Sequence, residues 1–503
     1  MQRREFMING SLSALASLML PALLQRRLFA GSELFDIPRP LDLKLNVKPL
    51  FGERIPAELH EGPCRPQDPR NWDPEKERKK VKQEFKEWRE ELKAELGDRI
   101  NILEPVYVEF AGDHRIGSQT WSKILSQDRE VDFYLLSHYR IPGLAWKTEK
   151  PLVFVGHKAT DLDVPALLKT KKNEEAYGFY EYEGMKKLLP ALEVRKRLSQ
   201  TRILNVTNGE WDYEYNSIRS NIDDDLLRKK FGMDNVFLPI HQLMGEYEKT
   251  KQDKTYLKEA GRITRELVQN AEKNTMKAED IQNSVLYYLN VKKVMEEMDC
   301  NSFTATCQEF CVTKLPMKYK VTPCLTHSLL KDEGYISACE SDLNVLFSMA
   351  LQMYLSHQSA YMGNTKIHDM DKNLLYMNHD VPGLKMKGLD QPDLPYRIVS
   401  FTERNWGATL RYDFSRDKGE TVTFSRMTPD AKKMLVVKGT IKDVEGLNRW
   451  GCRLRAIIKV PDARQYFQKA THTGHHYSLI YGDHVDEMKY LADILGIEFD
   501  TLT

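Results

Sequence analysis

A short apolar run that stops at a carboxylate and continues as a helix stands in the last third of the chain. Residues 334–339 read GYISAC and are introduced by a turn-like KDEG group, a pattern that predicts a buried strand. Glu340 follows directly, and Ser341 and Asp342 are both good N-cap residues. Apolar side chains then recur at helical spacing from Leu343 to Leu355. Glu340 is thus predicted between the end of a strand and the start of a helix, where open α/β sheets bind ligands.

Two more apolar runs follow at short range, and each ends in a polar side chain that can bind a metal. Residues 359–362 (SAYM) lead to Asn364, and residues 373–377 (NLLYM) lead to His379. Strand ends are often polar simply because the chain is leaving the core. Three such residues at consecutive strand ends, with Glu340 as the first, favour instead a divalent metal such as manganese or zinc.

The rest of the pattern predicts an α/β protein with two doubly wound parallel-sheet domains followed by a C-terminal antiparallel β-barrel domain. Strand-like and helix-like runs alternate from residue 99 onward. After Pro382 the runs become short and β-rich, with no long helix expected before Val485. The expected strands of the first part are 100–110, 131–136, 151–155 and 202–206, and the expected helices are 184–198, 254–272 and 278–298. The chain is expected to divide into five parts, residues 1–30, 31–98, 99–200, 201–385 and 386–503. Of these, 99–200 and 201–385 are the two parallel-sheet domains, and 386–503 is the β-barrel domain.

The N-terminal segment has the layout of an export signal. The letters QRREFM, followed by an apolar run rich in Ser, Gly and Ala, closely resemble a twin-arginine signal peptide over residues 1–30. We therefore expect export to the periplasm, and the apolar run is too short for stable membrane insertion. An amphipathic N-terminal helix of a cytosolic enzyme is the alternative.

Residues 31–98 are expected to be an extended segment followed by a charged helix. The helix covers 74–97 and carries a narrow apolar stripe of Val81, Phe85, Trp88 and Leu92. The stripe suits a helix docked on its own domain, and a partner-binding helix is the alternative.

Charge and motif content exclude several classes of function. Lys and Arg number 74 against 73 Asp and Glu, a formal net charge of +1, which argues against a nucleic-acid surface spread over the protein. The chain has no G-x-G-x-x-G or P-loop motif, so no dinucleotide or nucleoside triphosphate is indicated. Four of the seven cysteines lie between Cys300 and Cys324 without a zinc-finger spacing. These cysteines are expected to be buried free thiols, and a disulfide bond is the alternative.

Two polar segments could contact a ligand. The segment 206–225 interleaves aromatic and acidic residues around Trp211, which would suit stacking on a sugar ring or an ordinary surface loop. The segment THTGHHYSLIYGD contains His472, His475 and His476. It is either a surface histidine cluster or the source of one ligand in a shared metal site.

Four segments carry a resemblance to a known enzyme superfamily. In chain order they read PCLTHSLLKDEGYISACESDL, AYMGN, NLLYMNHDVPG and GHHYSLIYGD. In this order they resemble the L-fucose isomerase and L-arabinose isomerase superfamily, over roughly residues 99–503. The resemblance implies a divalent metal, usually manganese, bound by Glu340, Asn364 and His476, with His379 added as in the arabinose branch.

The same resemblance implies a function. It implies aldose–ketose isomerisation of a small carbohydrate through an enediolate, with Glu340 as the catalytic residue that moves the proton. Glu403 and Arg404 resemble segments that face the substrate. A homo-oligomer, trimer or hexamer, is the expected assembly.

One departure from the family pattern bears on the chemistry. The second acid of the family is Asn364 here, and an amide can offer an oxygen to a metal but cannot carry a proton. Glu309, Asp342 and Asp369 are the reserve candidates for a second acid. An exported sugar-binding or otherwise non-isomerase protein that retained the fold is the alternative function.

Overall fold

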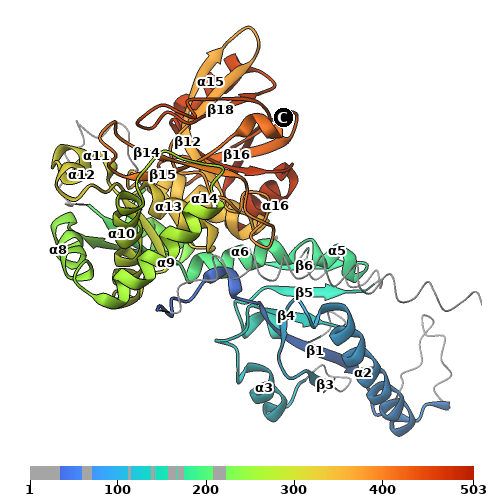
Figure 1. The fold of residues 1–503 in the computed structure, drawn as a ribbon. Helices are drawn as coiled ribbons and strands as arrows, with labels where there is room; N and C mark the ends of the chain where they lie inside the picture. Colours follow the sequence, from blue (N-terminus) through green and yellow to red (C-terminus); the bar gives the residue numbers. More distant parts are fainter. Residues whose placement is uncertain are drawn as a thin grey trace, which may run out of the picture. The chain divides into compact units, whose positions relative to one another are not determined.

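The structure is a computed structural model that describes residues 34–58, 71–110, 115–137, 141, 143–156, 166, 175–207 and 222–503. The chain forms two compact units, one of residues 43–196 and one of residues 197–503 together with the described residues before 43 (Figure 1). The predicted signal peptide and Trp211 lie outside the described residues.

The first unit is built on a parallel sheet with the strand order β2-β1-β4-β5-β6, and β3 also pairs with β1. Its strands are β1 (Asn46–Arg54), β2 (Asn101–Ile102), β3 (Val106–Phe110), β4 (Phe133–Leu136), β5 (Leu152–Val155) and β6 (Ala176–Phe179). Strand β1 comes from the segment that was expected to be extended, and it pairs with β2, β3 and β4 in the sheet. Pro49 and Gly52 interrupt the strand pattern in the sequence, yet Val47, Leu50 and Phe51 are buried.

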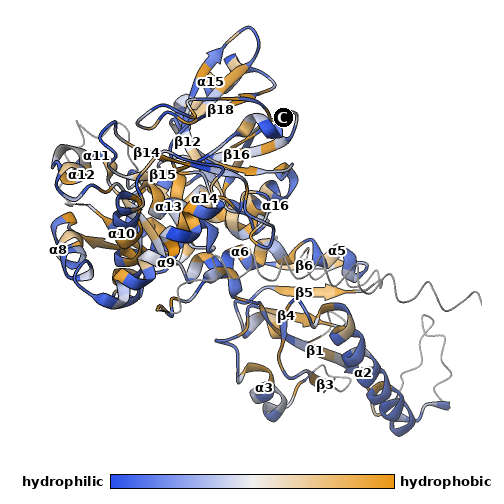
Figure 2. Ribbon diagram, viewed as in Figure 1, coloured by the Kyte–Doolittle hydropathy of each residue, from blue (hydrophilic) through white to orange (hydrophobic). Residues whose placement is uncertain are grey.

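The charged helix α2 (Pro74–Leu96) packs within this first unit. Asp73 caps it by accepting from the N–H groups of Glu75 and Lys76. Figure 2 shows α2 hydrophilic along most of its length, whereas β4 and β5 are hydrophobic. The rings of Phe85 and Trp88 lie 5.6 and 5.5 Å from the ring of Phe51 on β1. The apolar stripe therefore docks the helix on its own sheet, as the first interpretation predicted.

The other helices of the first unit are α3 (Ser118–Leu125), α5 (Tyr182–Lys186) and α6 (Leu189–Ser199). The helix expected over 184–198 with a proline kink is divided in two before Pro190, because proline lacks the N–H that a continuous helix would need there.

The second unit contains another parallel sheet, with the order β11-β10-β7-β8. Its strands are β7 (Arg202–Val206), β8 (Asp234–Leu238), β10 (Ser302–Ala305) and β11 (Ile336–Cys339). The associated helices are α7 (Asp224–Leu226), α8 (Ile240–Thr250), α9 (Lys254–Asn270), α10 (Ala278–Glu297), α11 (Cys307–Val312), α12 (Leu315–Tyr319), α13 (Cys324–Asp332) and α14 (Leu343–Ser356). The predicted pair of parallel sheets is confirmed.

The second unit also contains a seven-stranded sheet in the order β16-β19-β12-β13-β18-β17-β20. Its strands are β12 (Tyr361–Asp369), β13 (Leu374–Asn378), β16 (Thr421–Met427), β17 (Lys433–Glu445), β18 (Arg455–Lys459), β19 (His476–Tyr481) and β20 (Glu498–Leu502). All pairs are antiparallel except β17 with β20, and β16 pairs with β17 as well as with β19. The predicted antiparallel C-terminal sheet is confirmed, and its description as a barrel stays a prediction.

This sheet corrects two expectations. The runs 359–362 and 373–377 were expected to be strands of the second parallel sheet, but they belong to the antiparallel hairpin of β12 and β13. A helix α15 (Ala463–Thr473) also precedes α16 (Val485–Leu495), where no long helix was expected. A small sheet of β9 (Lys273–Asn274), β14 (Tyr396–Ser400) and β15 (Ala408–Tyr412) completes the unit.

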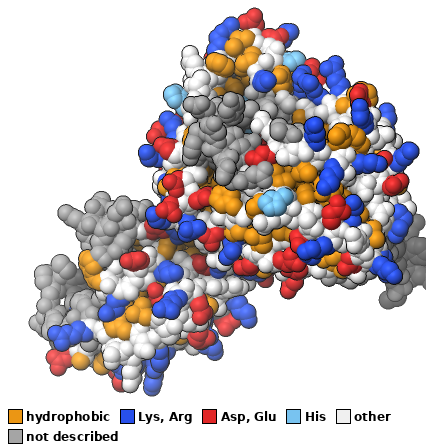
Figure 3. Space-filling view, turned by 90° about the vertical axis from the view of Figure 1, so that its left-hand side faces the viewer, with side chains coloured by type: hydrophobic (Ala, Val, Ile, Leu, Met, Phe, Trp, Pro, Cys, Tyr) orange, Lys and Arg blue, Asp and Glu red, His pale blue; other side chains and the backbone are white. Residues whose placement is uncertain are grey.

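The surface of the described residues carries both signs of charge. On the face shown in Figure 3, lysine and arginine side chains are interspersed with aspartate and glutamate. Among the helices that the structure describes, none is both long enough and apolar enough to cross a membrane.

Candidate metal centre

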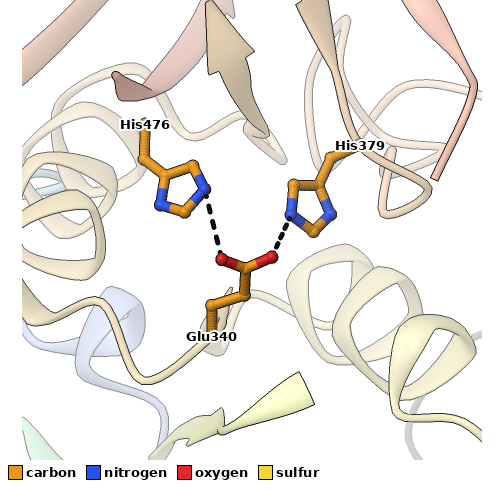
Figure 4. Close-up of side chains that lie close together, drawn as sticks. All are labelled: Glu340, His379 and His476. Carbon is orange, nitrogen blue, oxygen red and sulfur yellow. Dashed lines mark ion pairs between the residues drawn. The ribbon is translucent and has the colours of Figure 1, made fainter. Parts of the chain in front are cut away.

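Glu340, His379 and His476 converge on one point (Figure 4). Nε2 of His379 lies 3.3 Å from Oε1 of Glu340, and Nε2 of His476 lies 3.4 Å from Oε2 of the same carboxylate. One candidate ligand atom from each of the three residues lies within 4.8 Å of the other two. Both histidine side chains are buried, whereas the Glu340 side chain is 17% exposed. The arrangement is a compact site with access from solvent.

The backbone at Glu340 is held in an unfavourable conformation. Strand β11 ends at Cys339, and Glu340 and Ser341 then take φ angles of 67° and 51° before α14 begins. A non-glycine residue in this left-handed region costs of order 1–3 kcal/mol, and such residues cluster at functional sites. The hydroxyl of Ser341 lies 2.9 Å from that of Thr306 at the end of β10, which fixes the turn. The strained turn directs the Glu340 carboxylate toward the histidines.

Helix α14 connects this turn to the sheet that carries His476. Residues 343–354 of the helix are all buried. Asn344 donates to the carbonyl of Thr428, the Ser348 hydroxyl accepts from the N–H of Met427, and Gln352 donates to the carbonyl of Thr423. Because three buried side chains of the helix bond to β16 and to the residue after it, the helix cannot shift without breaking these bonds. Glu340 and β19, which pairs with β16, are therefore fixed relative to each other.

His476 is oriented by a buried carboxylate. Its Nδ1 lies 2.9 Å from Oδ2 of Asp342, and Nη1 of Arg426 donates to the same oxygen at 2.9 Å. Burial by itself would raise the pKa of Asp342, but Arg426 and His476 lower it below its usual range. Because the ionised carboxylate only accepts, Nδ1 of His476 is the donor, and Nε2 presents its lone pair toward Glu340.

His379 follows the last residue of β13, and its backbone is held by hydrogen bonds to Tyr361. Its N–H donates to the hydroxyl of Tyr361 at 2.9 Å, and this hydroxyl donates to the carbonyl of His379 at 2.9 Å. The Nδ1 atom of the ring lies 3.9 Å from the sulfur of Cys452. Burial by itself would lower the pKa of His379, but the neighbouring thiols of Cys452 and Cys339 and the Glu340 carboxylate raise it well above its usual value.

Glu340 is an ionised carboxylate. Burial by itself would raise its pKa, but the hydrogen bond and charge of His379, together with the charge of His476, lower the pKa to about 2. Two imidazoles and one carboxylate at this separation form a donor set suited to divalent manganese, iron or zinc.

Asn364 is aligned with this site by strand register. It lies directly opposite His476 across the β12–β19 pair and directly opposite Asn378 across the β12–β13 pair. Residues directly opposite in an antiparallel pair project from the same face, so Asn364 shares its face with His476.

Two buried atoms at this site lack a hydrogen-bond partner within the part of the chain that the structure describes. They are Oδ1 of Asn364 and Nε2 of His476. Buried polar atoms without a partner are rare and call for an explanation such as an ion. Both are electron-pair donors of the kind that a divalent cation binds, so the residues present fit the implied metal.

The other predicted residues lie elsewhere. Glu403 and Arg404 are exposed in the turn between β14 and β15, where the Arg404 guanidinium lies 5.6 Å from the centre of the Trp406 ring. Asp369 pairs with Lys372 in the hairpin turn, and Glu309 accepts from Thr207 at 3.3 Å. The predicted role of Glu403 and Arg404 at the substrate stays a prediction, as does that of Trp211.

Two residues around the histidines, Arg426 and Cys452, gave no functional signal in the sequence, and a third has a role other than the predicted one. Asp342 was expected to cap α14 and was a reserve candidate for the second acid; it caps the helix through Oδ1, and its other oxygen orients His476. Arg426 on β16 and Cys452 before β18 are far from the histidines in the sequence. Only the pairing of β16, β19, β13 and β18 brings them together.

Comparison with known proteins gives distant relatives. No family model matches the chain. The chain is 21% identical over 399 residues to the sulfoquinovose isomerases of Priestia aryabhattai and Priestia megaterium, covering 76% of this chain and 85% of those proteins. It is 25% identical over 184 residues to the sulfoquinovose isomerase of a Clostridium species, covering 36% of this chain and 40% of that protein. The protein is a distant relative of sulfoquinovose isomerases.

This finding corrects the resemblance drawn from the short motifs. The relatives are sulfoquinovose isomerases and not fucose isomerases, so the assignment to the L-fucose and L-arabinose superfamily was wrong. Glu340, Asn364 and His379 were read as the ends of consecutive strands in the second parallel-sheet domain. Only Glu340 follows a parallel strand, while Asn364 lies within an antiparallel strand and His379 directly follows one.

Proposed function

We propose that the protein is a divalent-metal-dependent aldose–ketose isomerase of a small carbohydrate. The observation that carries this proposal is the convergence of Glu340, His379 and His476 at the end of a parallel strand, in a chain related to sulfoquinovose isomerases. The substrate class follows from those relatives, so sulfoquinovose and other six-carbon aldoses are the first compounds to test.

Glu340, His379 and His476 would hold the metal, with the Asn364 side-chain oxygen as a further ligand. Manganese is the first candidate, because mixed carboxylate, amide and imidazole donors suit it. When bound, the ion would supply a Lewis acid for two adjacent oxygens of the open-chain sugar.

Glu340 would also move the proton. Isomerisation transfers a proton between C2 and C1 of the open-chain sugar through an enediolate. The pKa of Glu340 is lowered to about 2, so its carboxylate is ionised at neutral pH, the state that a proton acceptor requires. His476 keeps its orientation during this transfer because Asp342 and Arg426 hold the ring and the backbone carbonyl.

A second candidate function is an exported sugar-binding protein that does not isomerise its ligand. Asn364 favours it, because an amide cannot carry a proton and the reserve acids are already bonded to other side chains. Asp342 accepts from His476 and Arg426, Asp369 pairs with Lys372, and Glu309 accepts from Thr207. This alternative keeps the metal and the sugar but lacks turnover.

Elemental analysis of the purified protein, together with Glu340→Gln and His476→Ala, tests the proposal. The expected result is one divalent metal per chain in the wild type and a loss of that metal in both variants. Interconversion of sulfoquinovose or a related aldose with its ketose, detected by NMR, would then separate isomerase from binding protein. A wild type that takes up no metal when supplied with manganese would contradict both the metal site and the isomerase.

Export and assembly are separate proposals. We propose that residues 1–30 direct the protein to the periplasm and that the protein forms a homo-oligomer. Fractionation of cells that produce the chain with and without Arg3 and Arg4 tests the first, and light scattering of the purified protein tests the second.

A further inference from the structure

The two histidines of the site differ in what faces their Nδ1 atoms. His476 faces the carboxylate of Asp342 at 2.9 Å, and His379 faces the sulfur of Cys452 at 3.9 Å. In both rings Nε2 is the atom that points to Glu340 (Figure 4). Each ring is thus held between Glu340 on one side and an orienting side chain on the other, but the two orienting groups have different chemistry.

Cys452 is held firmly in this place. Its carbonyl accepts from the Nδ2 of Asn378, the residue before His379. The N–H of Leu454 donates to Asp380 Oδ1 at 3.0 Å, and the fully buried Arg411 donates both to Asp380 and to the carbonyl of Gly451. The turn that carries Cys452 is therefore fastened, on both sides of the cysteine, to the residues that flank His379.

A thiol can both donate and accept a hydrogen bond, whereas an ionised carboxylate can only accept one. The ionised Asp342 only accepts, so it allows a single tautomer of His476, with the proton on Nδ1. The sulfur of Cys452 can accept from Nδ1–H or donate its own proton to a bare Nδ1. A neutral His379 can therefore adopt either tautomer without losing its partner, and in one of them Nε2–H faces Glu340 Oε1 at 3.3 Å.

We infer that Cys452 is the positioning residue of His379, and that its thiol allows this ring to change tautomer when a metal binds. In the metal-binding tautomer Nδ1–H donates to the sulfur and Nε2 is free for the ion. His476 is permanently prepared for the metal, whereas His379 becomes a ligand only after its proton moves from Nε2 to Nδ1. The expected effect of Cys452 on metal affinity rests on the proposed function, whereas the hydrogen bond between Cys452 and His379 does not.

The variants Cys452→Ala and Cys452→Ser test this inference, with Cys300→Ala as the matched control. Cys300 is a buried free thiol whose sulfur contacts the carbonyl of Met298 instead of a histidine. The first readout is nitrogen NMR of the metal-free protein with labelled histidine in mildly alkaline buffer, with the His379 signals assigned through His379→Gln. Cys452→Ala should change the ratio of the two His379 tautomers and leave His476 unchanged, and Cys452→Ser should restore the wild-type ratio.

The second readout is the affinity for Mn²⁺ alone, measured by calorimetry. Loss of a side chain that orients a metal-binding histidine lowers metal affinity by about 10–100-fold. Cys452→Ala should show a loss of that size, Cys452→Ser should recover most of it, and Cys300→Ala should match the wild type. The thermal unfolding midpoint of each metal-free variant, measured in parallel, identifies any loss of affinity that comes from misfolding.

Unchanged His379 signals in a folded Cys452→Ala protein would overturn the inference. So would an Mn²⁺ affinity within about twofold of the wild type, a difference of less than about 0.5 kcal/mol in binding free energy. If the wild type binds no metal, the proposed function fails, and the NMR result alone decides the role of Cys452.

Discussion

Oδ2 of Asp342 lies 2.9 Å from Nδ1 of His476, although the two residues are 134 positions apart in the chain. The same aspartate caps α14 through its other oxygen, which accepts from the N–H groups of Asn344 and Val345. One buried side chain therefore fixes both the helix that follows Glu340 and the ring that faces Glu340. The alignment of the candidate metal site depends on this residue.

Replacement of Asp342 by asparagine should weaken metal binding without removing a ligand. The amide can still accept from Nδ1 of His476, but it lacks the charge that favours this tautomer and leaves Arg426 without its anionic partner. We expect a loss of about 10–100-fold in Mn²⁺ affinity, measured by calorimetry. Asp369→Asn, in the exposed hairpin turn, is the control, and equal affinities in the two variants would contradict the role of Asp342.

The ion pair between Asp342 and Arg426 should make stability depend on pH in the acid range. Because Arg426 and His476 hold the pKa of Asp342 below its unfolded value, the stabilisation is complete above about pH 4 and is lost as pH falls through the folded value. Asp342→Asn should cost about 3–5 kcal/mol of unfolding free energy at neutral pH, since it leaves a buried guanidinium unpaired. The difference from the wild type should shrink between about pH 4 and pH 2, as followed by denaturant titration at each pH. A difference that stays constant down to the lowest pH would exclude this linkage.

Replacement of Asn364 by aspartate should strengthen metal binding. The side chain shares a face with His476, and a carboxylate adds charge to the donor set where the amide offers only a dipole. We expect at least a tenfold gain in Mn²⁺ affinity, about 1.4 kcal/mol, measured by calorimetry. If the protein is an isomerase, turnover should be retained or rise. Asn378→Asp, on the same face of the neighbouring strand, is the matched control, and a gain confined to Asn378→Asp would place the site elsewhere.

Lys331 should matter for the position of His379 even though it is not a ligand. Its ammonium group is buried and donates to the carbonyls of Ala360 and Val381, before β12 and just after His379. Lys331→Met would leave both carbonyls unsatisfied, at a cost of roughly 1–3 kcal/mol each. We expect a lower free energy of unfolding and weaker Mn²⁺ binding together. Lys385→Met removes a bond to the exposed carbonyl of Gln391 and an ion pair with Asp393, neither of which involves the residues around His379, and it should leave Mn²⁺ binding unchanged.

The sequence allowed the local elements to be predicted better than their partners. The strand before Glu340, the cap at Asp342 and α14 follow from a short apolar run, a capping residue and a helical period, which are all local signals. The runs that lead to Asn364 and His379 were correctly read as strands, but they were assigned to the parallel sheet. Periodicity gives the type of an element and not the strand it will pair with, so β12 and β13 were misplaced.

The three residues that converge at the candidate site were named from the sequence, whereas the residues that support them were not. Glu340, His379 and His476 were named from strand ends and a histidine-rich motif, and the structure brings them together. Arg426 and Cys452 could not be found in this way, because their roles arise only when β16 pairs with β19 and the β17–β18 turn folds against His379. Strand β1 was not predicted as a strand for a different reason, because Pro49 and Gly52 interrupt its hydrophobic pattern.

The three candidate ligands come from segments that are distant in the chain, and this has a consequence for biogenesis. Contacts between segments so far apart form late in folding, because closing a long loop costs entropy before the contacts can stabilise the chain. A ribosome-bound chain that has not yet released β19 has no His476 beside Glu340. Metal loading would therefore follow synthesis of nearly the whole polypeptide, and the ion would fasten together a parallel and an antiparallel sheet that had folded before it arrived.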